Sequence, residues 1–495
     1  MRLPLSFVIS SVFFVSSTNA LPATPAVLED KTVSTEITKV IETTETVLLS
    51  EECPEGSLSP YEATARIPHT ILENEQASGT WLGKRDWLSS HGVDLSITYT
   101  ADIAGNPVGG MRPGGCTYAD AFAYACFLNT EKLLGWHGGY LTISALQLNG
   151  SNLSWQNIGN LFGVQEIYAM PTIYFVELSC EQKFWEDQVS LKTGRLVANN
   201  EFANSPLTWL YMNGGINGNP QALWMSARWP GYFNAAWGSR LKVDLPGSTV
   251  ARLGVYQMTP YSQHGLNWNF YSNDGIILVA QYGWNPEFFK TVVPETVADS
   301  SSKPIAIISS PQNNAPNRHA EKPVGTPSLK GFVGHYWMGG YYSTWEYPQF
   351  NSGFQTSNAY GLYWHMDQTV YRPKPQNDEG LILWSDCVLC PQQNLSLVPF
   401  QINAGVIYTG LIPGRRNDFT VWGVEYGNFS KDYANLVQQS GQGNPTYELV
   451  YELGYRVTLT KFAYVQPNLQ WIIRPAGTGT IPNALVLGAE MGVVF

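Results

Sequence analysis

The C-terminal part of the chain alternates apolar with polar or small side chains in three consecutive segments. These segments cover residues 447–455, 463–471 and 484–495. Such alternation predicts β-strands, because successive side chains of a strand point to opposite faces of the sheet. In the last segment one face is wholly apolar, while the other carries glycine, valine and Glu490. A wall between lipid and water has this pattern, although a soluble sheet can share it.

Similar segments recur through most of the chain. No stretch after the N-terminus holds the roughly 18 apolar residues that a membrane-spanning helix needs. If the chain crosses a membrane, it must therefore do so as a closed sheet, because unpaired backbone groups are too costly in hydrocarbon. The sequence predicts an all-β, antiparallel transmembrane barrel over residues 78–495, and the turn 245–249 predicts a hairpin. The segments before the last three are 93–102, 140–148, 173–181, 188–194, 237–245, 251–257, 275–282, 331–342, 359–371, 380–384, 400–410 and 420–426.

Composition narrows the class of protein further. Aromatic residues make up 13% and charged residues only 14%, against about 25% charged residues in typical soluble domains. Aromatic girdles at the two bilayer interfaces would account for this balance, and so would a secreted, sugar-binding β protein such as a lectin or glycosidase. The net charge of −11 argues against nucleic acid as a partner.

Four segments differ from the strand pattern. Residues 1–20 have the positive start, short apolar core and small C-terminal residues of a cleavable signal sequence. Residues 21–77 are rich in Thr, Glu, Pro and Val and predict a flexible periplasmic extension. A short helix is expected within 78–92, ending at a left-handed Gly92. Residues 284–330 predict a long loop, which we expect on the extracellular side.

Six cysteines in an exported chain favour disulfides. The candidates are Cys116 and Cys126, which flank one expected loop, and the close pair Cys387 and Cys390. A zinc site is disfavoured, because no second CxxC and no histidine pair stands near the CxxC. The sequence also lacks a G-x-S-x-G, an HExxH and a Walker loop, and it singles out no carboxylate pair for glycoside hydrolysis. We therefore expect neither an enzyme nor a bound cofactor.

Several short motifs resemble one known family when taken in order. The first motif, at the start of the predicted barrel, is Gly79-Thr-Trp-Leu-Gly-Lys-Arg85. The central motif runs from Arg195 through Asn199-Asn-Glu-Phe202 to Ser205-Pro206. The set is similar to the carbohydrate-selective porins of the OprB type. Further motifs that match are Ala236-Trp-Gly-Ser-Arg240, Tyr447-Glu-Leu-Val-Tyr451, Val465-Gln-Pro-Asn-Leu-Gln470, Ile473-Arg-Pro-Ala-Gly477 and Asn483-Ala-Leu-Val-Leu-Gly488.

The resemblance implies a sixteen-stranded outer-membrane barrel that lets sugars diffuse passively through a constriction formed by inward-folded loops. It also implies that Phe495 serves as a signal to the barrel-assembly machinery. Porins are often trimers, so a homotrimer is an expectation as well. In relatives, acidic residues are common where this chain has Asn199 and Asn200, so amino acids or dicarboxylates stay open as alternative solutes.

A lumen that selects sugars needs hydrogen-bond donors, acceptors and aromatic surfaces, but no tight site that would trap the solute. Arginine suits this role, because its planar fork stays charged and can bind neighbouring hydroxyl groups. Each candidate also has a structural interpretation, such as a solvated wall charge for Arg240 or a helix anchor for Trp81. Glu448, Glu452 and Arg456, spaced by four, predict a shared strand face and a wall network. The candidates for the constriction are Trp81, Arg85, Arg195, Asn199, Asn200, Glu201, Arg240 and Arg252.

Two other functions remain open from the sequence alone. One is a structural or adhesin-like outer-membrane barrel with a closed lumen, and the other is the secreted soluble β protein. The favoured hypothesis is a sugar-permeable porin in the outer membrane, with sugars and membrane lipid as its partners.

Overall fold

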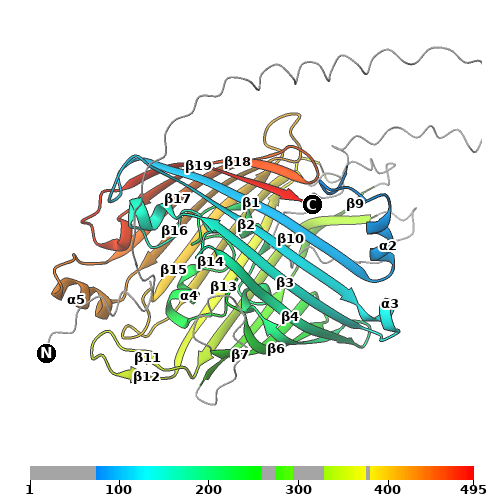
Figure 1. Ribbon diagram of the computed structural model, residues 1–495, viewed down its shortest axis with the longest axis horizontal. Helices are drawn as coiled ribbons and strands as arrows, with labels where there is room; N and C mark the ends of the chain where they lie inside the picture. The colour runs from blue at the N-terminus through cyan, green and yellow to red at the C-terminus, as the bar shows by residue number, and fades with distance from the viewer. Residues whose placement is uncertain (1–73, 259–273, 294–327, 375–378) are drawn as a thin grey trace, which may run out of the picture. The chain divides into compact units, whose positions relative to one another are not determined.

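The computed structural model describes residues 74–258, 274–293, 328–374 and 379–495. The predicted signal sequence, and the predicted extension up to residue 73, lie outside these ranges. One antiparallel sheet dominates the described part and curls into a barrel (Figure 1). Its strands are β1 (Val93–Val108), β2 (Gly115–Asn129), β3 (Gly139–Gly150), β4 (Thr172–Phe184), β5 (Val189–Leu196), β6 (Ala236–Leu245), β7 (Thr249–Met258), β8 (Gly275–Trp284), β9 (Glu287–Val293), β10 (Ser328–Ser343), β13 (Ala359–Tyr371), β14 (Gly380–Leu389), β15 (Phe400–Thr409), β16 (Phe419–Asn428), β17 (Tyr447–Thr458), β18 (Ala463–Ile473) and β19 (Ala484–Val494).

Strands β8 and β9 form one bent strand. Trp284 pairs with Tyr336 of β10, and Glu287 pairs with Val333 of the same strand, so the register continues across the break. Pro286 lies in the break, where its missing N–H costs the ladder no hydrogen bond. With these two counted as one, the wall has the sixteen strands that the family resemblance implies.

The sheet closes through its first and last strands. β1 pairs with β19 from Thr98↔Val494 to Val108↔Leu485, so no edge of the sheet is left open there. Closure is what allows a sheet to lie in a bilayer, since every backbone group of the wall finds its partner within the wall. The predicted transmembrane barrel is confirmed, and so is the hairpin of β6 and β7 around the turn at Pro246–Ser248.

Short helices lie before the first strand and in the connections between the strands. α2 (Lys84–Ser90) occupies the predicted N-terminal helix, and Gly92 has the expected left-handed backbone, with φ 92°. No helix within the described ranges is long and apolar enough to cross a bilayer. The others are α3 (Thr130–Leu134), α4 (Gln221–Ala227) and α5 (Lys431–Gln439), together with η2 (Ser154–Ile158), η3 (Ala198–Asn200), η4 (Pro206–Leu210) and η5 (Pro475–Gly477), and a small hairpin pairs β11 (Tyr347–Pro348) with β12 (Gln355–Thr356).

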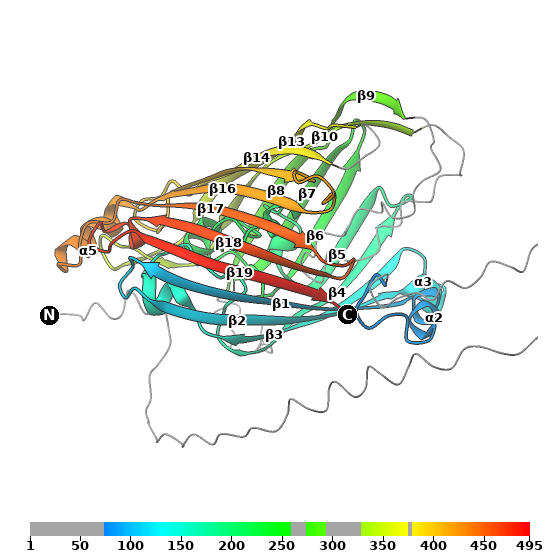
Figure 2. The same ribbon diagram turned by 90° about the horizontal axis from the view of Figure 1, so that it is seen from above.

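The two ends of the barrel carry different connections. The end with the C-terminal residue has α2, α3 and short turns, and the opposite end has α5 (Figure 2). β9 lies at the C-terminal end, so the connection between β9 and β10 leaves the wall there. The prediction of an extracellular 284–330 loop is therefore corrected. Its residues 287–293 and 328–330 are strand, and residues 294–327 lie outside the described ranges.

Side chains of the last strand alternate as predicted. Leu487 and Met491 are exposed on the outside, whereas Glu490 faces inward and is buried. The inward face meets protein, because the side chain of Met212 approaches within 3.5 Å of the position that a Cβ of Gly488 would occupy. Inward-folded chain therefore fills much of the lumen beside β19.

The predicted disulfides are absent. Cys116 and Cys126 both lie on β2, ten residues apart, so about 33 Å of extended strand separates them. Cys387 and Cys390 are three residues apart at the end of β14, which places their Cα atoms beyond the roughly 7 Å that a disulfide can span. All four thiols are free, because strands occupy the places where the sequence predicted loops.

Candidate functional site

Two connections fold into the barrel instead of projecting from it. They are the 151–171 loop between β3 and β4 and the 197–235 loop between β5 and β6. Their backbones touch each other, since Gly214 N donates to Gly163 O at 2.7 Å and Glu166 N donates to Met212 O at 3.1 Å. Together these two loops narrow the lumen.

Buried carboxylates of β17 hold both loops. Glu452 accepts hydrogen bonds from Met212 N at 2.6 Å and Asn213 N at 3.0 Å. Glu448 accepts one from Leu161 N and one from Phe162 N, each at 2.8 Å. Irregular loops inside a barrel cannot pair their backbone groups with a sheet, so wall side chains supply the missing acceptors. The predicted shared face of Glu448, Glu452 and Arg456 is confirmed, since all three side chains are buried on the inward side of β17.

Side-chain amides of the wall complete this attachment. Gln466 Nε2 donates to Leu210 O at 2.8 Å, and Gln470 Nε2 donates to Val164 O at 3.1 Å. Gln401 of β15, two strands along the wall from β17, binds the 197–235 loop as well, because its Oε1 accepts from Ala222 N at 2.7 Å. Several strands of one part of the wall thus fix the loops, so that the space beside them has a defined shape.

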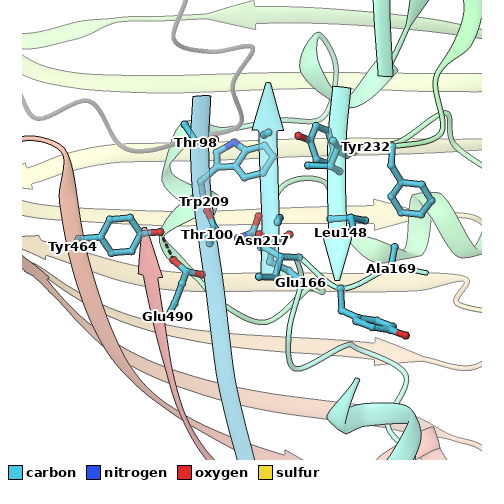
Figure 3. A pocket seen from close by; sticks show the side chains of 16 residues that line it. Thr98, Thr100, Leu148, Glu166, Ala169, Trp209, Asn217, Tyr232, Tyr464 and Glu490 are labelled. Carbon is cyan, nitrogen blue, oxygen red and sulfur yellow. Dashed lines mark hydrogen bonds between the residues drawn. The ribbon is translucent and has the colours of Figure 1, made fainter. Parts of the chain in front are cut away.

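A cavity of about 670 Å³, part of it open to solvent, remains between these loops and the wall. Its walls are strands β1–β3, β18 and β19 on one side and both loops on the other (Figure 3). Aliphatic, aromatic and polar side chains line it together, and such a mixture can bind the apolar faces and hydroxyl groups of sugars. The lining residues are Thr98, Thr100, Ala121, Ala123, Leu146, Leu148, Glu166, Ile167, Tyr168, Ala169, Trp209, Asn217, Tyr232, Phe233, Tyr464 and Glu490.

One edge of the cavity is held by an arginine on β17. Arg456 Nη2 donates to Glu490 Oε1 at 2.8 Å, and its guanidinium lies 3.9 Å from the centre of the Tyr464 ring. Tyr464 Oη donates to the same Glu490 oxygen at 2.6 Å, and the two side chains point at each other in Figure 3. Arg456 also donates to Trp209 O at 3.3 Å and so positions the indole at the cavity. The charge of Glu490 is therefore compensated.

Two residues that line the cavity carry polar atoms without a hydrogen-bond partner among the described residues. Trp209 Nε1 and Asn217 Oδ1 are buried and have no hydrogen-bond partner among the residues that the structure describes. Glu166 has no adjacent arginine of its own; burial, and then the negative charge of Glu490, raises its pKa to about 8. At neutral pH its carboxyl group mostly keeps its proton and can donate a hydrogen bond. The residues that line the cavity thus include an unpaired indole N–H, an unpaired amide oxygen and a carboxyl group among the described residues.

A second group of polar residues, the ion-pair cluster, comprises Glu177, Glu181, Lys192, Glu201 and Arg240. Arg240 bridges Glu181 at 3.0 Å and Glu201 at 2.9 Å, while Lys192 contacts Glu177 at 2.6 Å. Burial alone would raise the pKa of Glu201, but Arg240 and Lys192 hold it below the ordinary value. Three carboxylates against two cations leave the cluster with a net charge of −1. The structure therefore brings together two predicted residues, Arg240 and Glu201.

The remaining central candidates lie close by along the chain. Arg195 is buried at the end of β5, opposite Leu178 and Trp237. Asn199 and Asn200 form η3 directly before Glu201. Arg252 pairs with Lys242 across β6 and β7, so it shares the inward face with Arg240. None of these residues lines the cavity.

Arg85 and Trp81 occupy a different place. Arg85 Nη2 donates to the main-chain oxygen of Phe495 at 3.1 Å, and its guanidinium stacks 4.4 Å from the Trp81 ring. The pair thus ties the segment around α2 to the C-terminal residue, and neither side chain lines the cavity. This placement agrees with the anchoring role that the sequence left open for Trp81.

Sequence reasoning missed most of the cavity. Glu166, Trp209, Asn217 and Tyr232 stand in irregular segments without periodicity, and no motif marks them. The density of Trp, Tyr and Asn in 197–235 was the available signal. Within the described ranges, no group of three or more His, Cys, Asp or Glu side chains could hold a metal ion.

Comparison with known proteins identifies similar sequences. A family model described as "Carbohydrate-selective porin, OprB family" matches residues 114–495. The chain is 24% identical to Porin B of Pseudomonas aeruginosa over 455 residues, which covers 84% of this chain and 90% of that protein. It is 20% identical to a putative porin, QuiX, of Acinetobacter baylyi, with coverage of 84% and 92%.

A solved structure supports the fold. The high-pH structure of Pseudomonas putida OprB superposes with a TM-score of 0.74 at 22% identity, over 86% of this chain and all of that one. The low-pH structure of the same protein gives a TM-score of 0.53. At this level of identity the likeness establishes the barrel architecture.

The loop attachment predicts the effect of removing Glu452. Glu452→Leu leaves the N–H groups of Met212 and Asn213 without their acceptor, which costs about 1–3 kcal/mol for each buried group. We expect the 197–235 loop to loosen, so that single-channel conductance in planar bilayers rises and becomes noisier. Glu452→Gln, which keeps one acceptor oxygen, should lie between Glu452→Leu and the unaltered chain. Unchanged conductance in the leucine variant would contradict the anchoring role.

The ion-pair cluster predicts a change in ion selectivity. Arg240→Ala shifts its net charge from −1 to −2, and one unit charge about 10 Å from a passing ion in water contributes about 0.4 kcal/mol, or roughly twofold. We expect the cation-to-anion permeability ratio, measured from reversal potentials in a salt gradient, to rise by about that factor. Arg240→Lys should restore the original ratio, because it keeps the charge. A ratio that Arg240→Ala leaves unaltered would place the cluster away from the ion path.

Proposed function

The chain belongs to the OprB family of carbohydrate-selective porins, and from that premise we propose that sugars cross its lumen through the cavity beside Trp209, Asn217 and Glu166. The protein is a non-enzymatic channel of the outer membrane. The observation that carries the proposal is the pair of unpartnered polar atoms, Trp209 Nε1 and Asn217 Oδ1, at a cavity that also presents aromatic rings. The statement about unpartnered atoms refers to the described ranges of the chain.

The chemistry of the cavity favours neutral sugars. A hydroxyl group can accept from the Trp209 indole and donate to the Asn217 oxygen, and a ring face can lie against Tyr232 or Phe233. These contacts are few and neutral, so that a solute can bind and leave again, as conduction requires.

The same cavity disfavours solutes with a negative charge. Its lining contains two carboxyl groups, Glu166 and Glu490, and no lysine or arginine. Sugar acids and dicarboxylates would meet the charge of Glu166 whenever it loses its proton. We therefore rank dicarboxylates below neutral sugars among the solutes that the sequence left open.

The ion-pair cluster is the second element of the proposed path. Arg240, Lys192 and Glu201 face the lumen from the β5–β6 side, with side chains between 3% and 15% exposed. We propose that they set the transverse field and that Arg195, Asn199, Asn200 and Arg252 support this region of the wall. Arg85 and Trp81 have no part in the proposed path.

Other expectations stay proposals. We infer that residues 1–20 are removed as a signal sequence and that residues 21–77 lie in the periplasm. We also propose that Phe495 is the residue that the barrel-assembly machinery recognises, and that the outward apolar faces contact outer-membrane lipid. A closed-lumen structural barrel is the second hypothesis, and the buried, loop-filled lumen is the observation that favours it.

Liposome swelling tests the proposed path. Liposomes that contain the purified barrel should swell rapidly in neutral monosaccharides and slowly in dicarboxylates. Trp209→Ala removes the indole from the cavity, so all solutes should enter severalfold faster and the differences among them should shrink. Trp185→Ala, in the exposed β4–β5 turn, is the matched control and should behave as the unaltered chain. Absence of swelling in any solute would favour the closed-lumen barrel.

The raised pKa of Glu166 predicts a pH dependence. Below about pH 8 the carboxyl group is mostly neutral, and above it the group is charged. A unit charge about 5 Å from a solute carboxylate in water costs about 0.8 kcal/mol, or roughly fourfold. The swelling rate in gluconate relative to glucose should therefore fall by about that factor as pH rises through 8. Glu166→Gln should lose this dependence, and a variant that keeps it would exclude Glu166 as the titrating group.

A further inference from the structure

The cavity between the loops and the wall has more acidic than basic groups around it. Glu166 and Glu490 line it, and none of the described lysines or arginines does. Asp102 follows Thr100 on the inward face of β1 and stands directly opposite Glu490 of β19. Arg456 donates to Glu490 and so compensates one of these three carboxyl groups. The other two have no cation of their own among the described contacts.

Asp102 is the most isolated of the three. It is fully buried, and neither of its carboxyl oxygens has a hydrogen-bond partner within the described part of the chain. Side chains that stand opposite each other in an antiparallel pair lie about 5 Å apart, and like charges there destabilise the sheet. A buried charge without a partner is also costly. A cation in the cavity beside Glu490 would reduce both costs.

Asn217 adds a neutral acceptor whose direction is fixed. Its Nδ2 donates to Tyr211 O at 2.6 Å, so the amide group cannot turn over. Its Oδ1 is buried and has no partner among the described residues, and the side chain lines the cavity together with Glu166 (Figure 3). The segment before it lies against Glu166, because a Cβ on Gly214 would be 3.6 Å from the Glu166 Cβ. Two acceptors therefore belong to neighbouring parts of the lining.

An ammonium group suits this surplus of acceptors, since it carries a positive charge and three donors but no acceptor. An amino sugar brings this group in place of one hydroxyl group, at nearly the size of the neutral sugar. Its ring face and remaining hydroxyl groups can still meet Tyr232 and the indole of Trp209. We propose, on the basis of the solute path proposed above, that the cavity also carries protonated amino sugars such as glucosamine, and that these pass faster than neutral sugars of the same size.

The protonation of Glu166 allows such a solute to leave again. Burial, and then the charge of Glu490, raises its pKa to about 8. A nearby ammonium group has the opposite effect on that pKa, because it favours the charged carboxylate. Glu166 therefore loses its proton as the amino sugar arrives and regains it on departure. The cavity attracts the cation without a permanent charge at Glu166 that would trap it.

Tracer influx into proteoliposomes tests the proposal. Labelled glucosamine and labelled glucose are compared at about pH 7.5, below the pKa of roughly 8 that is usual for such an amine. We expect glucosamine to enter about two to four times faster, since one unit charge about 5 Å away in water contributes at most about fourfold. Glu166→Gln should lower this ratio about twofold, and Glu166→Asp, which keeps the charge, should retain it. Glu186→Gln, in the exposed β4–β5 turn, is the matched control and should leave the ratio unaltered.

Two results would overturn the inference while leaving the sugar path intact. One is a ratio of one or below in the unaltered chain that admits glucose, and the other is a ratio that Glu166→Gln does not change. Failure of both sugars to enter would count against the sugar path itself, and the inference would fall with it. Heat-dependent mobility on gels checks that each variant has formed its barrel. If a variant does not assemble, the ratio in the unaltered chain decides.

Discussion

The backbone of the inward loops needs hydrogen-bond partners, and the interior of this barrel is arranged around that need. A wall strand pairs with its neighbours, but the chain around Leu161 and Met212 has no neighbouring strand. Glu448 and Glu452 supply these partners, because each carboxylate accepts hydrogen bonds from two adjacent loop N–H groups. The two carboxylates stand four positions apart on β17, so one strand face holds both loops. The position of the cavity, and of Trp209 within it, depends on these contacts.

The strands of the wall could be predicted from the sequence, because the alternation of their side chains is visible within each short segment. Alternation along β17–β19 indicated which side chains face lipid, and the spacing of Glu448, Glu452 and Arg456 indicated their shared face. Arg240 and Glu201 were predicted as separate candidates, and the structure brings them together because one lies on β6 and the other follows β5. β2 was not predicted, because its inward face is a row of alanines, which weakens the contrast in polarity and size between its two faces.

What the sequence did not predict depends on contacts between distant parts of the chain. The cavity is formed by irregular segments whose course is decided by acceptors on other strands, so its residues have no local pattern. Arg85 and Trp81 stand in a recognisable motif, but a motif does not say at which end of the barrel it lies. The cysteine pairing failed for a related reason, because spacing along the chain becomes distance only once the strand is known. The segment 284–330 was predicted as loop throughout, because Pro286 interrupts the strand pattern where β8 continues into β9.

The long sequence separation of the loop contacts has a consequence for assembly. Glu448 lies 287 residues after Leu161, and Glu452 lies 240 residues after Met212. Contacts of such high contact order cannot form until the late strands have joined the sheet. The loops therefore gain their acceptors only as β17 arrives, near the moment when β19 meets β1. In this architecture the narrowing of the channel and the closing of the barrel are a single late event, so a partly assembled wall would have an unnarrowed lumen.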